Sequence, residues 1–318
     1  MKILITGAGG FVGQALSRQL EKTAGVTTHG LGRRPQSGEN YSQIDLTQPF
    51  DLDFNPDTVI HTAARVTPWG TKQEFVRQNV LATKHVMDFC AKKNVQSLIY
   101  ISSTAVFYQE KDQFGITEKT PIGPEFVNLY AKTKHEGECL IKRFRHRHVI
   151  LRPRAVFGPG DTVLFPRILA AAKAGRLPRL LRPDPPAKGD LIYIDCLRDY
   201  IIQAAMNPQI SGEFNLTNNT TVELEAFLFK VLDKLDIPRP TRKIKLQTAL
   251  AAASLTEWLY KYALPGKEPP VTRFGISSFG FSKTFDATKT LQAFGPPSTD
   301  VETGINRFVE WQRAHMPA

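Results

Sequence analysis

The chain has 318 residues, of which 42% are hydrophobic and 22% charged, and it carries a formal net charge of +11. This length suits one large α/β unit of two lobes, and the composition, in which no repeat is found, excludes a disordered or fibrous protein. The positive charge is scattered, and its densest run, residues 142–148, has no recognised nucleic-acid motif, so we expect no nucleic-acid partner.

Three cysteines, Cys90, Cys139 and Cys196, lie far apart without metal-ligand spacing, so the sequence predicts no metal site. The first apolar run starts beside Lys2, which leaves no room for a signal or transit peptide before it. We therefore expect a protein of the reducing cytoplasm.

The first motif is a glycine-rich turn in residues 2–13, KILITGAGGFVG. Residues 3–5 form a continuous apolar run, as expected for a strand that is buried on both faces of a parallel sheet. The spaced glycines permit a tight turn, a close approach of the backbone to a pyrophosphate and close helix–strand packing, while the helix N-terminus offers free N–H groups. The pattern predicts a dinucleotide site that includes Gly7, Gly10, Phe11, Val12 and Gly13.

Residues 26–31 form the second predicted strand, and the residue after it normally distinguishes the two nicotinamide cofactors. An acidic residue there would hydrogen-bond the ribose 2′-hydroxyl and repel a 2′-phosphate. This chain instead has Gly32, followed by Arg33 and Arg34. The pattern favours NADP, with NAD as the alternative.

Two more predicted strands end at the same edge of the sheet. The third ends at Asp45 and Leu46, and the fourth ends in the run HTAA, which begins at His61. The carboxyl ends of parallel strands line the cofactor crevice. Small residues flank His61, so we expect a packed structural histidine there. Backbone contacts to the cofactor would come from Thr62, Ala63 and Ala64.

A tyrosine and a lysine, Tyr130 and Lys134, follow the fifth predicted strand, which ends at Ser102 and Ser103. On a helix this spacing places both side chains on one face, so the ammonium group can stabilise the phenolate. A free tyrosine has a pKa of about 10, and acid–base chemistry near neutral pH requires a nearby cation to lower it. The pair therefore predicts a proton-transfer site.

These motifs resemble those of the extended short-chain dehydrogenase/reductase superfamily. The resemblance rests on TGAGGFVG, HTAA, ISSTAVF, YAKTK and RPRAVFGPGD, which occur in the family's order. The segment AARVTPWGTKQEFVRQNV and the stretch from PPVTRF through FDATKTLQAFG are similar to the branch of 3β-hydroxysteroid dehydrogenases and bacterial β-keto acid reductases. The resemblance covers almost the whole chain and is weaker in its last third.

The resemblance implies that Tyr130 donates or accepts the proton. Lys134 would lower the pKa of this tyrosine and hold the nicotinamide ribose. Ser103 would hydrogen-bond the substrate oxygen, because counting back from Phe107 places it at the family's catalytic position. Ser102 remains the alternative.

Asn79, on a predicted helix at residues 75–93, resembles the family's structural or relay asparagine and completes the expected catalytic set. Pro153 and Val156 are expected to line the nicotinamide site.

The expected fold is α/β, a doubly wound parallel Rossmann sheet with a second, smaller, mainly helical substrate lobe. Residues 1–160 would form the NADP-binding domain, to which residues 190–215 return, and residues 161–318 would form the lobe. The resemblance also implies a homodimer through the helices that contain Phe75 and Tyr130.

An apolar stretch at residues 246–264 is interrupted by Glu257 and Lys261, which argues against a membrane span. We expect a lobe helix that covers the substrate, and a weak membrane contact stays open.

The expected activity is hydride transfer between nicotinamide and a secondary alcohol or ketone, with a small-molecule substrate such as a steroid or β-keto acid. Thr104 follows Ser103 where the sugar dehydratases have an acidic pair, and Gly189 stands near the position of the diphosphate-binding arginine of nucleotide-sugar enzymes. Residues expected to line an apolar pocket are Phe157, Leu164, Phe165, Trp258 and Leu259, with Arg152, Arg154 and Arg167 available for a carboxylate. The alternatives are a nucleotide-sugar epimerase and a non-catalytic NADP-sensing protein.

Overall fold

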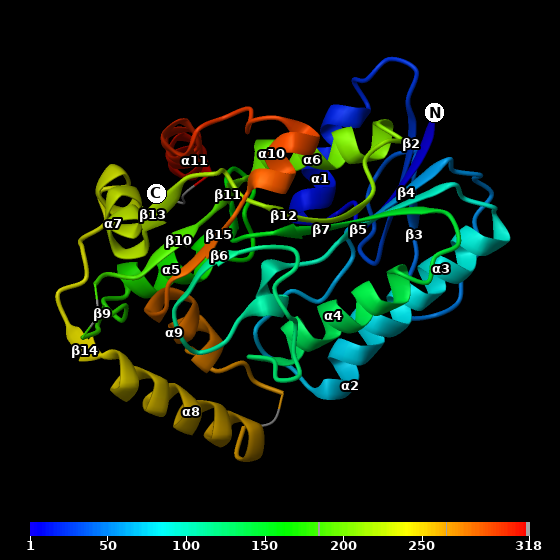
Figure 1. Cartoon of the computed structure of the whole chain (residues 1–318). Helices are drawn as coiled ribbons and strands as arrows, with labels where there is room; N and C mark the ends of the chain where they lie inside the picture. Colours follow the sequence, from blue (N-terminus) through cyan, green and yellow to red (C-terminus); the bar gives the residue numbers. More distant parts are fainter. Residues whose placement is uncertain (184, 265, 316–318) are drawn as a thin grey trace.

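The computed structural model describes residues 1–183, 185–264 and 266–315. Seven parallel strands form the central sheet, in the order β12-β7-β5-β4-β1-β2-β3 (Figure 1). This order confirms the expected doubly wound fold, and it changes direction between β1 and β4, where such sheets bind their ligands. The strands are β1 (Lys2–Thr6), β2 (Thr27–Gly32), β3 (Tyr41–Gln43), β4 (Thr58–His61), β5 (Ser97–Ile101), β7 (Arg147–Pro153) and β12 (Gly212–Leu216).

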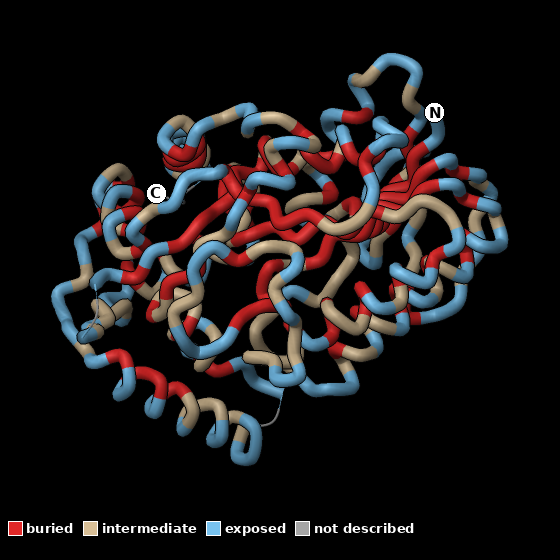
Figure 2. The backbone as a smooth tube through the Cα atoms, in the orientation of Figure 1, coloured by how far each residue is buried: buried red, intermediate tan, exposed pale blue. Residues whose placement is uncertain are grey.

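Helices cover both faces of this sheet because its inner strands are apolar on both sides. Ile3 and Ile5 of β1 pack into one core cluster with Leu16, whereas Leu4 packs into a second cluster with Val86. Figure 2 shows these strands as the most deeply buried part of the chain. One face carries α1 (Phe11–Leu20) and α6 (Ile194–Met206), and the other carries α2 (Lys72–Phe75), η1 (Val76–Leu81), α3 (Ala82–Lys92) and α4 (Leu129–Ile141).

A second sheet has four strands in the order β13-β10-β15-β6 and joins segments far apart in the sequence. Its strands are β6 (Gln113–Ile116), β10 (Lys188–Asp190), β13 (Thr221–Glu223) and β15 (Lys283–Phe285). Two short pairs are β8 (Val156–Phe157) with β11 (Ile192–Tyr193) and β9 (Arg179–Leu181) with β14 (Lys243–Lys245). The remaining helices are η2 (Thr104–Phe107), α5 (Phe165–Lys173), α7 (Leu224–Lys234), α8 (Leu246–Tyr262), α9 (Arg273–Gly280), α10 (Thr288–Phe294) and α11 (Val301–His315).

The predicted division of the chain at residue 160 stays a prediction. Within the described ranges, no helix combines the length and apolarity that crossing a bilayer requires.

Two predicted strands differ in their bounds. β2 begins one residue later than the predicted strand, and it includes Gly32, which pairs with Gln43 of β3. β3 ends at Gln43, so Asp45 and Leu46 lie beyond it rather than at its end. Asp45 there accepts a hydrogen bond from the backbone N–H of Thr47 at 3.0 Å, a turn that terminates the extended segment.

Two predicted helices also differ. The helix expected at residues 75–93 begins at Lys72, because Thr71 and Glu74 form a capping box that the sequence analysis missed. The apolar segment of residues 221–235 also favours a helix from Thr221 to Leu235, but this helix begins at Leu224, because the preceding residues pair with β10 as strand β13.

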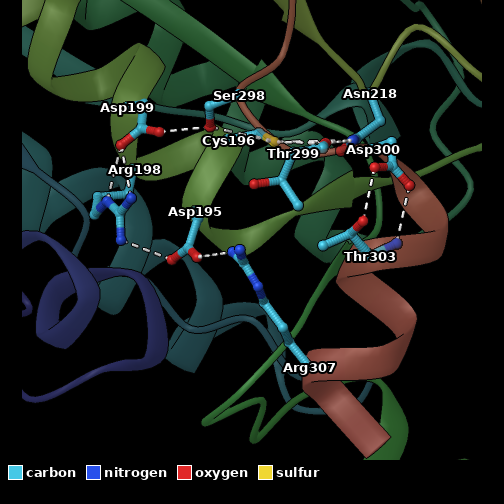
Figure 3. A network of polar contacts seen from close by, with 10 residues as sticks. All are labelled: Asp195, Cys196, Arg198, Asp199, Asn218, Ser298, Thr299, Asp300, Thr303 and Arg307. Carbon is cyan, nitrogen blue, oxygen red and sulfur yellow. Dashed lines mark hydrogen bonds and ion pairs between the residues drawn. The ribbon is translucent and has the colours of Figure 1, made fainter.

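A polar network ties the C-terminal helix to α6 (Figure 3). Asp195 accepts a hydrogen bond from Arg198 at 2.7 Å and forms an ion pair with Arg307 of α11 at 3.5 Å. Asn218, which follows β12, donates to the carbonyl of Thr299 at 2.6 Å. These contacts hold the end of the chain against the helix layer that covers the central sheet.

Candidate active site

The glycine turn lies at the end of β1, where the strand order changes direction. Gly7 has a φ of +72°, and its carbonyl accepts a hydrogen bond from the Gly10 N–H at 2.9 Å. A Cβ atom at Gly13 would lie 2.1 Å from the same carbonyl oxygen, so only glycine lets α1 start this close to the strand. Among the described residues no side chain caps the start of α1, which leaves its first N–H groups available to an anion.

The two predicted arginines lie at the rim of this turn. Arg33 and Arg34 follow β2 and are exposed. Their backbone carbonyls accept hydrogen bonds from the Gln43 side chain at 2.9 Å and from the Tyr41 hydroxyl at 2.5 Å. These bonds anchor the backbone of the segment and do not involve either guanidinium group.

Asp45 lies among cations. Burial would raise the pKa of its carboxyl, but the hydrogen bond from the Thr47 backbone N–H and the charges of Arg33 and Arg77 lower this pKa overall. Arg77 is a cation near this rim that the sequence analysis did not single out. Leu46 is buried, and its carbonyl contacts His85 Nδ1 at 2.9 Å.

The segment after β4 closes over the glycine turn. A Cβ atom at Gly7 would lie 2.8 Å from the Cα of Ala63, and the Thr62 hydroxyl donates to the Thr6 carbonyl at 2.7 Å. Thr62, Ala63 and Ala64 are half-buried beside this turn, and their contact with the cofactor stays a prediction. His61 is fully buried as expected, where burial lowers its pKa to about 3.

The two serines after β5 have different partners. Ser103, just before η2, lies close enough to Tyr130 to lower the pKa of its hydroxyl, and it accepts a hydrogen bond from the Ala105 N–H at 3.2 Å. Ser102 is buried and donates to the carboxylate of Glu138 at 2.5 Å. Ser103 is therefore the serine that the fold brings to Tyr130.

Tyr130 lies in the first turn of α4, which Asn128 caps by accepting a hydrogen bond from the Ala131 N–H at 2.8 Å. The residue is half-buried, but its hydroxyl lies deep enough that burial raises its pKa to about 12, against a lowering by Ser103. The direction is opposite to the one expected from the tyrosine–lysine spacing. Loss of hydration outweighs the stabilisation of the phenolate.

Lys134 explains this difference, because its ammonium group is directed elsewhere. Nζ donates to the carbonyl of Ile101 at 2.5 Å and lies 4.4 Å from the centroid of the Tyr100 ring. Burial lowers the pKa of this lysine to about 7, although the nearby Glu138 carboxylate raises it.

Asn79 is buried within the π-helical segment η1 and bridges two elements. Its Oδ1 accepts from the Arg65 N–H at 2.6 Å, and its Nδ2 donates to the Thr133 hydroxyl at 3.0 Å. Thr133 precedes Lys134 on α4, so Asn79 joins the segment after β4 to the helix that carries the tyrosine–lysine pair. These contacts fit positioning better than proton transfer.

A glycine turn at the strand-order reversal, followed by a Ser–Tyr–Lys set, characterises a known group of enzymes. Residues 3–216 match the NAD dependent epimerase/dehydratase family. The chain belongs to this family. It is an NAD-dependent enzyme of the short-chain dehydrogenase/reductase type, which confirms the resemblance seen in its motifs.

Two curated proteins illustrate its relatives in the family. The 2-alkyl-3-oxoalkanoate reductase of Shewanella oneidensis is 28% identical over 329 residues, covering 96% of this chain and 84% of the relative. A 3beta-hydroxysteroid-dehydrogenase/decarboxylase of Arabidopsis thaliana is 28% identical over 301 residues, covering 88% and 68%. Among solved structures, the UDP-glucuronic acid 4-epimerase of Bacillus cereus in complex with NAD has a TM-score of 0.73 and 20% identity, with 99% of both chains covered. This last likeness shows the shared fold.

The residues present fit the dinucleotide cofactor that the epimerase/dehydratase family requires. The turn is closed to any Cβ atom at Gly7 or Gly13, and the start of α1 offers N–H donors. Phe11 and Val12 open this helix and are half-buried. Pro153 and Val156 were expected to line the nicotinamide site. Pro153 ends β7, and Val156 begins β8.

The three arginines considered for a substrate carboxylate differ in their surroundings. Arg152 is paired with Glu138 inside the core, and Arg167 forms an ion pair with Glu268 at 2.5 Å. Arg154 is buried, and its Nε has no hydrogen-bond partner among the described residues. Unlike the other two, Arg154 forms no ion pair with a described residue, so it is the one of the three that remains available to an anion.

A second buried cation stands near Arg154. The Arg154 guanidinium lies 5.3 Å from the centroid of the Tyr108 ring, and Lys283 Nζ lies 5.6 Å from the same centroid. The nearby Asp190 carboxylate is occupied, because it accepts hydrogen bonds from the Thr221 hydroxyl at 2.6 Å and the Phe285 N–H at 2.7 Å.

Arg154 also borders a small apolar pocket between α5, α7 and α9. Its walls include Leu164, Phe165, Leu191, Phe227, Leu228 and Phe279. Leu164 and Phe165 therefore line a pocket as expected. Phe157 is instead buried in the core, and Trp258 and Leu259 are exposed on α8, so these three expectations were wrong.

Proposed function

We propose that the protein transfers a hydride between a nicotinamide cofactor and the carbonyl or hydroxyl carbon of an apolar 3-oxo or 3-hydroxy substrate. The observation that carries this proposal is the placement of Ser103 beside Tyr130, which lies on the same helix as Lys134. The relatives named as a 2-alkyl-3-oxoalkanoate reductase and a steroid dehydrogenase support the substrate class.

The raised pKa of Tyr130, about 12, keeps its hydroxyl protonated at neutral pH. A protonated phenol suits donation to a ketone oxygen, which is the reductive direction. Ser103 would hold the same oxygen through its hydroxyl. The bound cofactor supplies the hydride, and the chain's own residues position the oxygen and move its proton.

The substrate is proposed to carry a carboxylate that Arg154 binds, with hydrocarbon in the apolar pocket beside it. A buried N–H group without an acceptor is costly, as at Nε of Arg154 among the described residues, and a carboxylate offers a guanidinium charge-assisted hydrogen bonds. Lys283, whose Nζ also lies near the Tyr108 ring, adds to the positive field.

Three further features are part of the proposal. NADP is preferred over NAD because Arg33 and Arg34 are exposed beside the glycine turn and no acid ends β2. The protein forms a homodimer through the helices that contain Phe75 and Tyr130, and it acts in the cytoplasm, where its cysteines, which are free, stay reduced.

The test follows NAD(P)H oxidation with four substrates: a 2-alkyl-3-oxo acid, a ketone of the same length without a carboxylate, a 3-keto steroid and UDP-glucose. We expect turnover of the oxo acid. Compared with the wild type, Arg154→Leu should have a KM at least about tenfold higher for the oxo acid, but not for the substrates without a carboxylate. Arg167→Leu, which removes an arginine that is already paired, is the matched control and should leave the KM unchanged.

The alternative is a nucleotide-sugar epimerase, which the fold of the solved neighbours permits. Interconversion of a UDP-sugar without net cofactor oxidation, together with no turnover of any ketone, would favour that alternative and overturn the proposal.

A further inference from the structure

Helix α8 carries large apolar side chains on its outer face. Leu255, Trp258, Leu259 and Tyr262 are 68%, 59%, 45% and 63% exposed, and their spacing of three and four residues places them on one side of the helix. We name these four residues the α8 stripe. The opposite side is buried and consists of Leu246, Ala249, Leu250 and Ala253. Packing of α8 against α9 therefore leaves the stripe uncovered in this chain. Figure 2 shows the outward side of this helix coloured as exposed.

Cations stand at both ends of the stripe. Lys243 and Lys245 precede α8, while Lys261 and Lys267 lie at and beyond its end. All four are exposed, and none forms an ion pair with another described residue. Such a surface combines an apolar centre with unneutralised positive ends.

The acidic side chains nearby are already occupied. Glu257, the acid within α8, is half-buried and accepts a hydrogen bond from the Arg273 N–H at 2.8 Å. Glu268, beside Lys267, is paired with Arg167 at 2.5 Å. The stripe therefore presents apolar and positive groups to its surroundings, and its acids do not cancel the charge.

We propose that the α8 stripe attaches the protein to an anionic lipid bilayer, with α8 lying in the plane of the interface. Tryptophan and tyrosine favour the membrane–water boundary, and leucine side chains can enter the acyl region beneath it. Lysines at the two ends of the helix would meet anionic headgroups, which attract basic segments close to the surface. The net charge of +11 favours the same encounter.

A second copy of this chain fits the stripe less well. An antiparallel pair of α8 helices would bring Lys245 of one copy towards Lys261 of the other, and a parallel pair would bring each lysine towards its own equivalent. Both arrangements place like charges together across the contact, which disfavours association. An anionic surface neutralises both ends at once.

The position of α8 links this surface to the apolar pocket. α8 packs against α9, and Ser278 and Phe279 of α9 line the pocket beside Arg154. Attachment through the stripe would hold that pocket near the lipid bilayer, in which apolar molecules concentrate. The attachment itself does not depend on the proposed activity, so binding to vesicles can be tested separately from turnover.

The experiment measures co-sedimentation of the full chain with vesicles of phosphatidylcholine alone or mixed with phosphatidylglycerol. We expect binding at least about tenfold tighter to the anionic vesicles, weakening as salt is added. Leu255→Ser combined with Leu259→Ser should lower this binding at least about tenfold. Met206→Ser, which changes a residue that is 45% exposed at the end of α6, is the matched control and should bind like the wild type.

Two further measurements separate the bilayer from other occupants. Tryptophan emission should shift to shorter wavelength with anionic vesicles, and Trp258→Phe should abolish most of that shift. Light scattering of the wild type and the double serine variant should give the same mass. Absent vesicle binding at low salt, or equal binding by the double variant, would overturn the proposal. So would a dimer that the serine changes dissociate, which would assign the stripe to a second copy.

Discussion

Arg152 of β7 donates two hydrogen bonds, at 2.8 and 2.7 Å, to the carboxylate of Glu138 on α4, and both side chains are fully enclosed. The same carboxylate accepts a hydrogen bond from Ser102 at the end of β5. Glu138 also lies one turn after Lys134, whose ammonium charge it favours against the effect of burial. This ion pair therefore fixes the helix that carries Tyr130 onto the sheet.

Replacing Glu138 by Gln should destabilise the fold by about 3 to 5 kcal/mol, because it leaves the Arg152 charge buried without a partner. Urea unfolding checks this value. Asp88→Asn, which breaks the exposed pair with Lys84 on α3, is the control and should have a much smaller effect. Equal effects of the two changes would contradict a structural role for the buried pair.

Tyr130→Phe should lower turnover by roughly 10² to 10⁴ while the fold and cofactor affinity stay nearly intact, because only the proton-bearing oxygen is removed. Steady-state kinetics and cofactor titration measure both quantities. Tyr200→Phe, which changes a buried tyrosine of α6 outside the site, should retain turnover. Near wild-type activity of Tyr130→Phe would show that another group transfers the proton.

Lys134→Ala should impair both turnover and cofactor binding.

NADP(H) should bind more tightly than NAD(H), by a margin on the order of 1 to 3 kcal/mol, because Arg33 and Arg34 can pair with a 2′-phosphate. Replacing both arginines by alanine should remove this margin without weakening NAD(H). Arg145→Ala removes an exposed arginine elsewhere and should change neither affinity. Titrations that give equal affinities for the two cofactors in the wild type would refute the preference.

Acid should destabilise the protein through His61. Burial lowers the pKa of this histidine to about 3. Below pH 6.5 the histidine is therefore protonated in the unfolded chain but stays neutral in the folded protein. The contribution is complete above pH 6.5 and is lost as the pH falls towards 3, by about 2 kcal/mol between pH 6.5 and 5. Unfolding midpoints of the wild type and His61→Gln should converge over this range. Parallel pH profiles would show that other groups account for the acid sensitivity.

The sequence alone was sufficient to predict the structure where interactions between residues close in the chain decide it. The glycine turn from Gly7 to Gly13 follows from the need for a tight turn and close packing, and the apolar runs predict a parallel sheet buried on both faces. Counting from Phe107 also selected Ser103, the serine that the structure places beside Tyr130. The capping box at Thr71 was equally local and could have been found from its spacing with Glu74.

Tertiary structure decided what depends on neighbours distant in sequence. Arg152, Arg154 and Arg167 are alike in the sequence. Only the positions of Glu138 and Glu268 show that, within the described part of the chain, Arg154 is the one of the three without an ion-pair partner. The pKa of Tyr130 rises because the fold removes its hydroxyl from water, an effect that helical spacing does not contain. For Trp258 the sequence determined an apolar helix position. Which side of α8 packs against α9 is a property of the assembled chain, because burial is set by all neighbours together.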